Sequence, residues 1–328
     1  MGMTKLVTIF GGSGFVGRYV ARRLARDGWR IRIAVRRPNE ALFLKPYGAV
    51  GQVEPVFCNI RDDASVHSVL AGADAVVNCV GILAPSGRNG FDSIQVEGAG
   101  RVARLAAEAG VGRLVHISAI GADAQSDSDY ARSKAEGEGA VRAAFPAAVI
   151  LRPSIIFGPE DEFFNRFAAM ARPWPVLPVI HADTKFQPVY VDDVAKAVVA
   201  GIDGAAPGIY ELGGPEVETF RALMDQMLVV IMRKRKVVEL PLGLANIMAS
   251  VMDGLSSASG GLIANTTVSR DQLKLLAKDN VVAANAQGFA ELGVEPLAFE
   301  AVIPEYLWRF RPSGQYARMR ESAKSRKA

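Results

Sequence analysis

The glycines at positions 11, 14 and 17 constrain the fold more than any other feature of this 328-residue chain. An apolar run from Leu6 to Phe10 precedes them and is typical of a buried parallel strand. A helix-compatible run from Phe15 to Asp27 follows, and Gly28 stands where a C-terminal cap belongs. Strand, glycine turn and helix in this order predict a dinucleotide-binding unit with a pyrophosphate at the helix N-terminus. An ordinary turn with spare glycines is the alternative interpretation.

Each glycine has a separate physical task in such a unit. Gly11 allows the tight turn, Gly14 lets the backbone approach the pyrophosphate, and Gly17 lets the helix pack closely on the strand. We expect their neighbours in the same turn to contact the cofactor as well, namely Ser13, Phe15, Val16 and Arg18.

Strand-like and helix-like runs alternate through roughly the first two hundred residues. The strands are expected at Arg30–Val35, Val53–Cys58, Ala75–Val80, Arg113–Ser118, Ala147–Pro153 and Gly208–Leu212, and the helices at Ala64–Leu70, Asp92–Ala109 and Asp129–Ala144. This rhythm predicts an α/β fold with a doubly wound parallel sheet covered on both faces. Beyond Pro215 the pattern is helical, so we expect the dinucleotide-binding, Rossmann-like domain to comprise residues 1–214. Residues 215–328 would form a smaller, mainly helical docking or substrate domain with a basic tail.

Composition excludes several classes of protein. The formal net charge of +4 is modest and does not indicate nucleic-acid binding. The two cysteines and three histidines have neither a disulfide framework nor metal-ligand spacing, so no metal is expected and a reducing compartment is favoured. We expect no signal peptide and no membrane span, and therefore a soluble or peripheral protein.

The end of the second strand indicates which dinucleotide binds. An NAD site usually places Asp or Glu there to hold the ribose 2′-hydroxyl, but this chain has Arg36 and Arg37. Guanidinium groups bind phosphate through paired, charge-assisted hydrogen bonds, so the sequence predicts NADPH. A solvated basic loop is the alternative. Further contacts are expected from Asn59 and Ile60 beside the adenine, and from Val80, Gly81 and Ile82 after the fourth strand.

Tyr130 and Lys134 are the candidate catalytic pair, because a spacing of four residues places them one turn apart on one helix face. We expect the ammonium group to lower the pKa of the phenol and make it a usable proton donor. The lysine can also hold the nicotinamide ribose. An exposed helix pair without a chemical role is the alternative.

Together these motifs resemble the short-chain dehydrogenase/reductase superfamily, in its extended and atypical branches. The resemblance rests on Gly-x-x-Gly-x-x-Gly, Tyr-x-x-x-Lys, Leu151–Pro159 and Val191–Val194. Within the superfamily the chain is similar to the NADPH-binding accessory subunits of respiratory complex I, through Ala144–Ala147, Arg152–Gly158, Phe163–Ala168, Gln187–Val191, Val268–Asp271 and Glu291–Val294. The resemblance implies further cofactor contacts from Ser118, Pro153 and Ile156.

Two departures from the superfamily pattern bear on turnover. Ile120 occupies the expected position of the catalytic hydroxyl, while Ser118 lies deeper, and Gln95 replaces the usual helix Asn. Loss of one donor to a developing oxyanion costs roughly 10²–10³ in rate. The resemblance therefore implies that Tyr130 and Lys134 contact the cofactor ribose without supporting efficient catalysis.

The C-terminal part suggests a partner. Leu244, Ile247, Met248, Val251, Met252 and Leu255 form one helical stripe, preceded by the basic run Arg233–Lys236. This stripe either covers the protein's own core or contacts a partner or an anionic lipid surface. The basic tail from Arg309 to Lys327 is either a solvated end or a second contact to such a surface.

The resemblance thus implies an NADPH-binding accessory subunit that contacts other complex I subunits and stabilises or helps assemble the enzyme. It would be peripheral, on the cytoplasmic side of a bacterial inner membrane or on the matrix side of a mitochondrial one. A free-standing NADPH-dependent reductase or epimerase acting on a small carbonyl or nucleotide-sugar substrate is the main alternative, supported by the Tyr130–Lys134 pair. An NADP-sensing regulator is a third possibility that no specific residue favours.

Overall fold

The computed structural model describes residues 4–243, 247, 250 and 269–316. Seven parallel strands form one sheet in the order β11-β6-β5-β4-β1-β2-β3. They are β1 (Leu6–Phe10), β2 (Arg30–Val35), β3 (Val53–Phe57), β4 (Ala75–Asn78), β5 (Arg113–Ile117), β6 (Val149–Pro153) and β11 (Gly208–Leu212). The expected doubly wound α/β fold is confirmed. The strand order reverses between β1 and β4, which is where such folds bind ligands.

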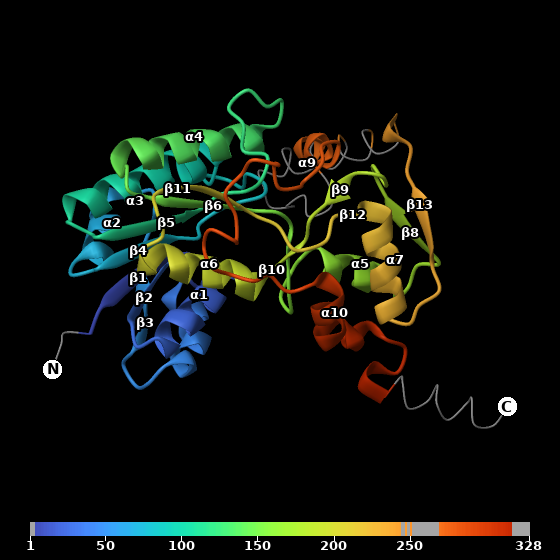
Figure 1. The fold of residues 1–328 in the computed structure, drawn as a ribbon, viewed down its shortest axis with the longest axis horizontal. Coiled ribbons are helices and arrows are strands. Elements are labelled where there is room, and N and C mark those ends of the chain that lie inside the picture. The colour runs from blue at the N-terminus through green and yellow to red at the C-terminus, as the bar shows by residue number, and fades with distance from the viewer. Residues whose placement is uncertain (1–3, 244–246, 248–249, 251–268, 317–328) are drawn as a thin grey trace.

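Helices cover both faces of the sheet (Figure 1). On one face lie α1 (Phe15–Arg26), α6 (Val191–Asp203) and the 3₁₀ helix η1 (Pro38–Tyr47). On the other lie α2 (Asp63–Leu70), α3 (Glu97–Glu108) and α4 (Asp129–Ala144), with a π-helical turn, η2 (Asp92–Val96), before α3. Each face has its own apolar core, and all five residues of β1 are buried between the two. This burial on both sides explains why the strand sequences are almost continuously apolar.

A second lobe lies beside the sheet, at the right of Figure 1. Its helices are α5 (Phe164–Met170), α7 (Phe220–Val230), α9 (Arg270–Leu276) and α10 (Phe299–Leu307), followed by 3₁₀ turns η3 (Trp308–Phe310) and η4 (Gly314–Tyr316). Its short strands pair as β7 (Ile156–Phe157) with β10 (Val189–Tyr190), β8 (Val176–Val179) with β13 (Lys236–Glu239), and β9 (Lys185–Phe186) with β12 (Glu218–Thr219). The helical C-terminal region is confirmed. The strands β12 and β13 were not predicted there, because each depends on a partner strand far away in the sequence.

Aromatic side chains dominate the core of the second lobe. Phe157 and Phe164 contact Phe299 with ring centroids 5.1 and 4.7 Å apart. The same core includes Phe186 and Phe220, so it draws on residues before and after position 214. In the opposite direction, Phe289 and Leu292 pack into the core of the sheet. The division into 1–214 and 215–328 stays a prediction, and each of the two cores contains residues from both sides of that boundary.

Segment 280–296 is hydrogen-bonded to strand β11 and so connects the C-terminal part of the chain to the sheet. The backbone N–H of Glu211 donates to the Gln287 carbonyl oxygen at 2.8 Å. Nearer β6, the Asn280 side-chain oxygen accepts hydrogen bonds from the Ser154 hydroxyl at 2.6 Å and from the Ile155 N–H at 3.1 Å. The polypeptide thus returns to the sheet beside the second lobe.

Among the described residues, no helix is both long and apolar enough to cross a membrane. Most of the expected amphipathic stripe, namely Leu244, Met248, Val251, Met252 and Leu255, lies outside the described residues. The same holds for the basic tail from position 317 onward.

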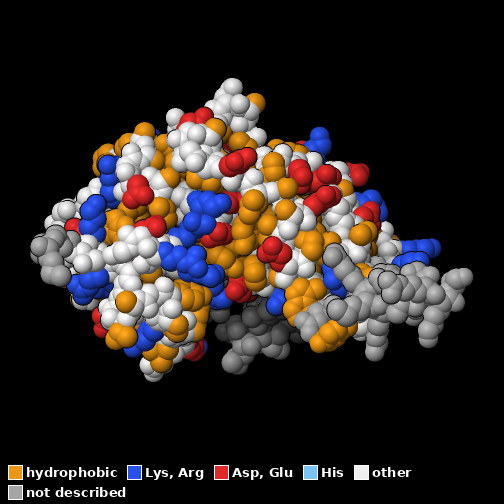
Figure 2. Space-filling view, turned by 60° about the horizontal axis from the view of Figure 1, so that its bottom comes forward, with side chains coloured by type: hydrophobic (Ala, Val, Ile, Leu, Met, Phe, Trp, Pro, Cys, Tyr) orange, Lys and Arg blue, Asp and Glu red, His pale blue; other side chains and the backbone are white. Residues whose placement is uncertain are grey.

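One face of the molecule carries gathered positive charge. Figure 2 shows Lys and Arg side chains clustered near the middle of this face, on the side of the sheet-containing lobe, with apolar atoms beside them. Helix α1 contributes four arginines to the protein surface. Arg23 is paired with Asp192 at 2.5 Å, whereas Arg22 and Arg26 are exposed. The basic residues in the last turn of α1 also suit the negative end of the helix dipole.

Candidate nucleotide-binding site

The glycine turn between β1 and α1 has the geometry that the sequence predicted. Gly11 adopts φ +72°, which favours glycine, and its carbonyl oxygen accepts from the Gly14 N–H at 2.9 Å. A Cβ on Gly17 would lie 2.5 Å from the Gly11 oxygen and 2.6 Å from the Gly12 Cα, so only glycine fits there. A Cβ on Gly14 would meet only the Gly11 oxygen, at 3.1 Å. Gly14 thus leaves open the space in front of the N-terminus of α1, where a phosphate would bind.

A cavity of about 570 Å³ opens at the carboxyl ends of β1 to β4. The predicted cofactor residues that line it are Gly11, Ser13, Gly14, Arg36, Arg37, Asn59, Ile60, Val80, Gly81 and Ile82. Phe10, Glu40, Cys58, Cys79, Asn89 and Ile94 line it as well, although the sequence did not single them out. A phosphate-binding helix terminus, an apolar wall and a basic rim in one cavity fit the adenosine and pyrophosphate portion of a dinucleotide.

The two arginines at the end of β2 differ in their surroundings. Both are exposed at the cavity rim. The Arg37 guanidinium lies 3.0 Å from the Glu40 carboxylate. Glu40 therefore partly offsets the charge of Arg37 toward a phosphate, and Arg36 is the stronger candidate for that contact.

Arg18, in contrast, braces the turn from outside the cavity. Its guanidinium donates to the Ser13 and Gly14 carbonyl oxygens at 3.1 and 3.2 Å and lies 3.7 Å from Glu160. It also lies over the Phe43 ring, 5.1 Å from the centroid. Phe15, Val16 and Gly17 form the first turn of α1, and like Arg18 they are not among the residues lining the described cavity.

Tyr130 and Lys134 lie on α4, with the lysine nitrogen 5.9 Å from the tyrosine ring centroid. Lys134 is buried, and its ammonium group donates to the Ile117 carbonyl oxygen at 3.3 Å. A Cβ on Gly81 would lie 3.3 Å from the lysine nitrogen, so Lys134 sits directly behind the cavity wall. This placement suits a contact to the nicotinamide ribose.

The expected lowering of the Tyr130 pKa is wrong. Burial raises the pKa of Tyr130 to about 12. Burial also lowers the pKa of Lys134 to about 8, although Glu138 and Cys79 act against this shift. The cost of desolvating the phenolate therefore exceeds any attraction by the Lys134 ammonium group, whose nitrogen lies 5.9 Å from the ring centroid.

Gln95 provides a buried acceptor near Lys134. Its side-chain nitrogen donates to the Ser133 hydroxyl at 3.0 Å, and Ser133 in turn donates to the Tyr130 carbonyl oxygen at 2.8 Å. Among the residues that the structure describes, none pairs with the buried side-chain oxygen of Gln95, which would lie 3.8 Å from a Cβ on Gly81. It belongs to the π-helical turn η2, and such turns are frequent at functional sites. An orphaned acceptor there fits a site completed by a bound group or a water.

The Ser118 hydroxyl faces a buried ion pair. It donates to the Glu138 carboxylate at 2.5 Å, and the same carboxylate accepts two hydrogen bonds from the Arg152 guanidinium at 2.8 and 2.7 Å. The Ile120 N–H donates to the Pro153 carbonyl oxygen at 3.0 Å, which holds Ile120 at the end of β5. Neither Ser118, Pro153 nor Ile156 is among the residues that line the described cavity. The sequence did not reveal Glu138, although its position four residues after Lys134 could have suggested it.

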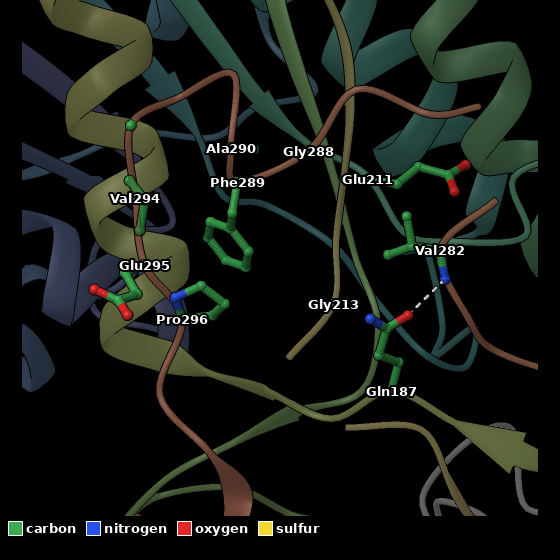
Figure 3. Close-up of a pocket in the computed structure, with 11 residues that line it drawn as sticks. Gln187, Glu211, Gly213, Val282, Gly288, Phe289, Ala290, Val294, Glu295 and Pro296 are labelled. Atoms are coloured by element: carbon green, nitrogen blue, oxygen red, sulfur yellow. Dashed lines mark hydrogen bonds between the residues drawn. The ribbon is translucent and has the colours of Figure 1, made fainter. Parts of the chain in front are cut away.

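A second hollow lies at the edge strand β11 (Figure 3). It has a volume of about 530 Å³ and is lined mainly by segment 282–296, with Gln187, Glu211 and Gly213. The Gln187 side chain accepts from the Val282 N–H and donates to the Gly214 carbonyl oxygen, while Glu211 accepts from the Ala283 N–H. These polar groups are used to fasten the chain's own backbone.

Comparison with known proteins agrees with this geometry. Residues 7–213 match the model of the NAD dependent epimerase/dehydratase family. The crystal structure of DesIV, a dTDP-glucose 4,6-dehydratase from Streptomyces venezuelae with NAD and TYD bound, is similar with a TM-score of 0.68. That similarity covers 93% of this chain and 96% of DesIV at 21% identity, so it supports the fold alone.

Two relatives are closer in sequence. The chain is 34% identical to subunit 9 of the NADH dehydrogenase [ubiquinone] 1 alpha subcomplex, mitochondrial, from Arabidopsis thaliana, over 94% of this chain and 79% of the relative. It is also 34% identical to a ceramide reductase from Caulobacter vibrioides, over 72% of this chain and 74% of that enzyme. The family match spans more than half of the chain, and this protein therefore belongs to the NAD dependent epimerase/dehydratase family.

Proposed function

We propose that this protein is an NADPH-binding accessory subunit of a complex I-type NADH:quinone oxidoreductase, which it stabilises or helps to assemble without turnover of its own. The main observation behind this proposal is that the chain has a cavity suited to a dinucleotide but lacks the catalytic hydroxyl expected at position 120. Ser118 is bound to Glu138, and the apolar Ile120 occupies the expected donor position. Similarity to a mitochondrial NADH dehydrogenase subunit over almost the whole chain supports the same assignment.

NADPH is the form of the dinucleotide that we propose. The ends of its binding site would be Arg36 with Arg37 for the 2′-phosphate, and Lys134 with Tyr130 for the nicotinamide ribose. The N-terminus of α1 beyond Gly14 would bind the pyrophosphate. When bound, NADPH can supply a hydride, but transfer to a carbonyl also needs a proton donor and a second donor to the oxygen.

The protein would dock peripherally, on the cytoplasmic side of a bacterial inner membrane or on the matrix side of a mitochondrial one. The second lobe carries a surface suited to anionic lipid. Residues 172–176 are all exposed and include Arg172 and Trp174, the latter 62% exposed. Val176 of β8 stands opposite Lys236 of β13. Val238, also on β13, is 42% exposed. Tryptophan beside lysine and arginine on an apolar surface is typical of a membrane interface.

A reductase remains the second candidate function, because a specific observation favours it. A ceramide reductase is among the relatives, and the Tyr130–Lys134 pair is present. The raised pKa of Tyr130 keeps its proton in place at neutral pH, so the phenol can still act as an acid. What such an enzyme would need is another donor in place of the hydroxyl at position 120.

Native mass spectrometry of the protein released gently from its own membranes tests the proposal. We expect the intact chain together with other subunits of the oxidoreductase and one NADPH. A Gly14→Val variant should lack the nucleotide, and it serves as the control for the mass assignment. Recovery of the chain alone, with full respiratory activity in cells that lack it, would favour the reductase instead.

A further inference from the structure

Asp271 of α9 is hydrogen-bonded to the N-terminus of α4, the helix that carries Tyr130 and Lys134. Its carboxylate accepts from the Ser128 hydroxyl at 2.9 Å, the Asp129 N–H at 2.7 Å and the Tyr130 N–H at 3.1 Å. Asp271 and Tyr130 are 141 positions apart along the chain. Figure 1 shows α9 near α4, on the side of the second lobe that faces the sheet.

This contact is electrostatically favourable, because the first N–H groups of a helix lack partners within the helix. A carboxylate placed there also interacts with the positive end of the helix dipole. Ser128 is the N-cap of α4, and its side-chain oxygen accepts a hydrogen bond from the Ala131 N–H at 3.3 Å. The same hydroxyl donates a hydrogen bond to Asp271. The first turn of α4 is therefore held by its own cap and by a carboxylate from another part of the chain.

Two lysines of α9 and the turn after it hold the same region. Lys274 donates to the Asp127 carbonyl oxygen at 2.8 Å, and Lys278 lies 3.3 Å from the Asp127 carboxylate. Asp129 is paired with Arg132 within α4. These cations offset the repulsion among the carboxylates of Asp127, Asp129 and Asp271. Helix α9 is in turn bound to the rest of the second lobe, because the Leu276 carbonyl oxygen accepts a hydrogen bond from the Thr184 hydroxyl at 2.7 Å.

The same turn of α4 organises the nicotinamide end of the site. The Tyr130 ring packs edge-on against Phe91, with centroids 6.0 Å apart. The Tyr130 carbonyl oxygen accepts from Ser133, whose oxygen binds Gln95. Movement of α9 away from α4 would therefore release the backbone of Tyr130 and loosen this chain of contacts.

We infer that Asp271 is a positioning residue that couples the second lobe to the nicotinamide end of the dinucleotide site. The inference rests on the proposed binding of NADPH. Closure of α9 on α4 favours the arrangement of Tyr130 and Lys134 that binds the nicotinamide ribose. By linkage, bound NADPH favours the conformation in which α9 is packed on α4. This is then also the conformation of the second lobe to which a partner would bind. The adenosine end, formed by β1 to β4, is outside this coupling.

The test compares Asp271→Asn with the control Asp225→Asn, an exposed aspartate on α7, in the full chain. Affinity is measured by calorimetry for NADPH and for 2′,5′-ADP, which lacks the nicotinamide mononucleotide half and with it one phosphate of the pyrophosphate. We expect Asp271→Asn to weaken NADPH binding about fivefold or more, the lower end of ordinary coupling between sites. Binding of 2′,5′-ADP should be unchanged, and Asp225→Asn should change neither. Hydrogen exchange of residues 128–134 should be slowed by NADPH in the wild type and much less in Asp271→Asn.

Equal NADPH affinity in wild type and Asp271→Asn would overturn the inference. Equal weakening for both nucleotides would also overturn it, since that result indicates a general structural defect. Ser128→Ala removes one of the three donors and covers the case in which Asp271→Asn does not fold; it should weaken NADPH binding selectively and by a smaller factor. Failure of the wild type to bind either nucleotide would contradict the proposed function itself.

Discussion

Ser118 donates its hydroxyl proton to Glu138 across 2.5 Å, and Glu138 is simultaneously paired with Arg152. Both Ser118 and Glu138 are buried, at 4% and 3% exposure. A hydroxyl committed to a buried ion pair is a poor partner for a substrate oxygen, because moving it would leave the carboxylate short of a donor. The sequence placed Ser118 among the cofactor contacts, whereas the structure gives its side chain an internal partner.

Tyr130→Phe provides the first test. The substitution keeps the ring and its packing against Phe91. It removes the phenol hydroxyl, which is the proton donor that a reductase would use. We expect respiratory activity to stay nearly unchanged, and the wild type to oxidise NADPH negligibly against aldehydes, ketones, nucleotide sugars and ceramide precursors. Turnover at ~1 s⁻¹ or faster that disappears in Tyr130→Phe would decide for the reductase.

Ser118→Ala should separate stability from nucleotide binding. Removing a donor from a buried carboxylate costs about 1–3 kcal/mol, so we expect a fall of that size in the free energy of unfolding. The NADPH affinity should be unaffected, because the hydroxyl is directed at Glu138. Denaturant titration measures the free energy of unfolding, and calorimetry measures the NADPH affinity. A loss of affinity without a loss of stability would show that Ser118 contacts the nucleotide.

Gly14 and Gly17 should respond differently to a side chain. Gly14 has φ −70°, so valine can adopt its backbone conformation, and we expect the apo-protein to remain folded while pyrophosphate binding is lost. Any side chain on Gly17 meets the backbone of Gly11 and Gly12, so Gly17→Ala should lower the free energy of unfolding by about 3 kcal/mol. Thermal unfolding with and without NADPH distinguishes them: Gly14→Val should lose only the NADPH-dependent increase. Retained NADPH stabilisation in Gly14→Val would contradict the assigned phosphate position.

Arg36 should determine the preference for NADPH. We expect the wild type to bind NADPH more than about tenfold tighter than NADH, since a guanidinium forms charge-assisted bonds to phosphate. Arg36→Asp should narrow or reverse this preference. Arg37→Ala should have a smaller effect, because Glu40 already neutralises part of its charge. Equal affinities for the two nucleotides in the wild type would eliminate the 2′-phosphate assignment.

Lys134 should make stability depend on pH in the alkaline range. Burial lowers the pKa of Lys134 from 10.5 to about 8, whereas the unfolded chain keeps the ordinary value. Between these pH values the unfolded state binds more protons, so the free energy of unfolding should rise with pH by at most about 3 kcal/mol from this group. Burial raises the pKa of Cys58 and Cys79, which acts in the opposite direction at high pH.

The difference between wild type and Lys134→Met isolates the lysine from those thiols. We expect the variant to lack the rise between pH 8 and 10.5, and Lys278→Met, which removes an exposed lysine, to keep it. Parallel profiles for all three proteins would show that Lys134 has the same pKa in the folded and unfolded states.

The sequence alone determined the parts of this protein that depend on neighbouring residues. Apolar runs predicted each strand of the main sheet to within two residues, because strands covered on both faces are apolar along most of their length. The spacing of the glycines predicted the tight turn at Gly11 and the close packing at Gly17, since both follow from local backbone geometry. Strand order then placed Arg36, Asn59 and Gly81 around one cavity, as expected for loops that follow adjacent parallel strands.

Tertiary structure alone decided whether each side chain is available. No local pattern shows that Ser118 meets Glu138, that Arg18 turns to Glu160, or that Asp271 reaches α4 from far along the chain. The same is true of the Tyr130 pKa, which depends on how many atoms of the folded protein exclude water from the phenol. Hydrogen bonds and burial are set by residues brought together in space, and the sequence around each group does not contain that information.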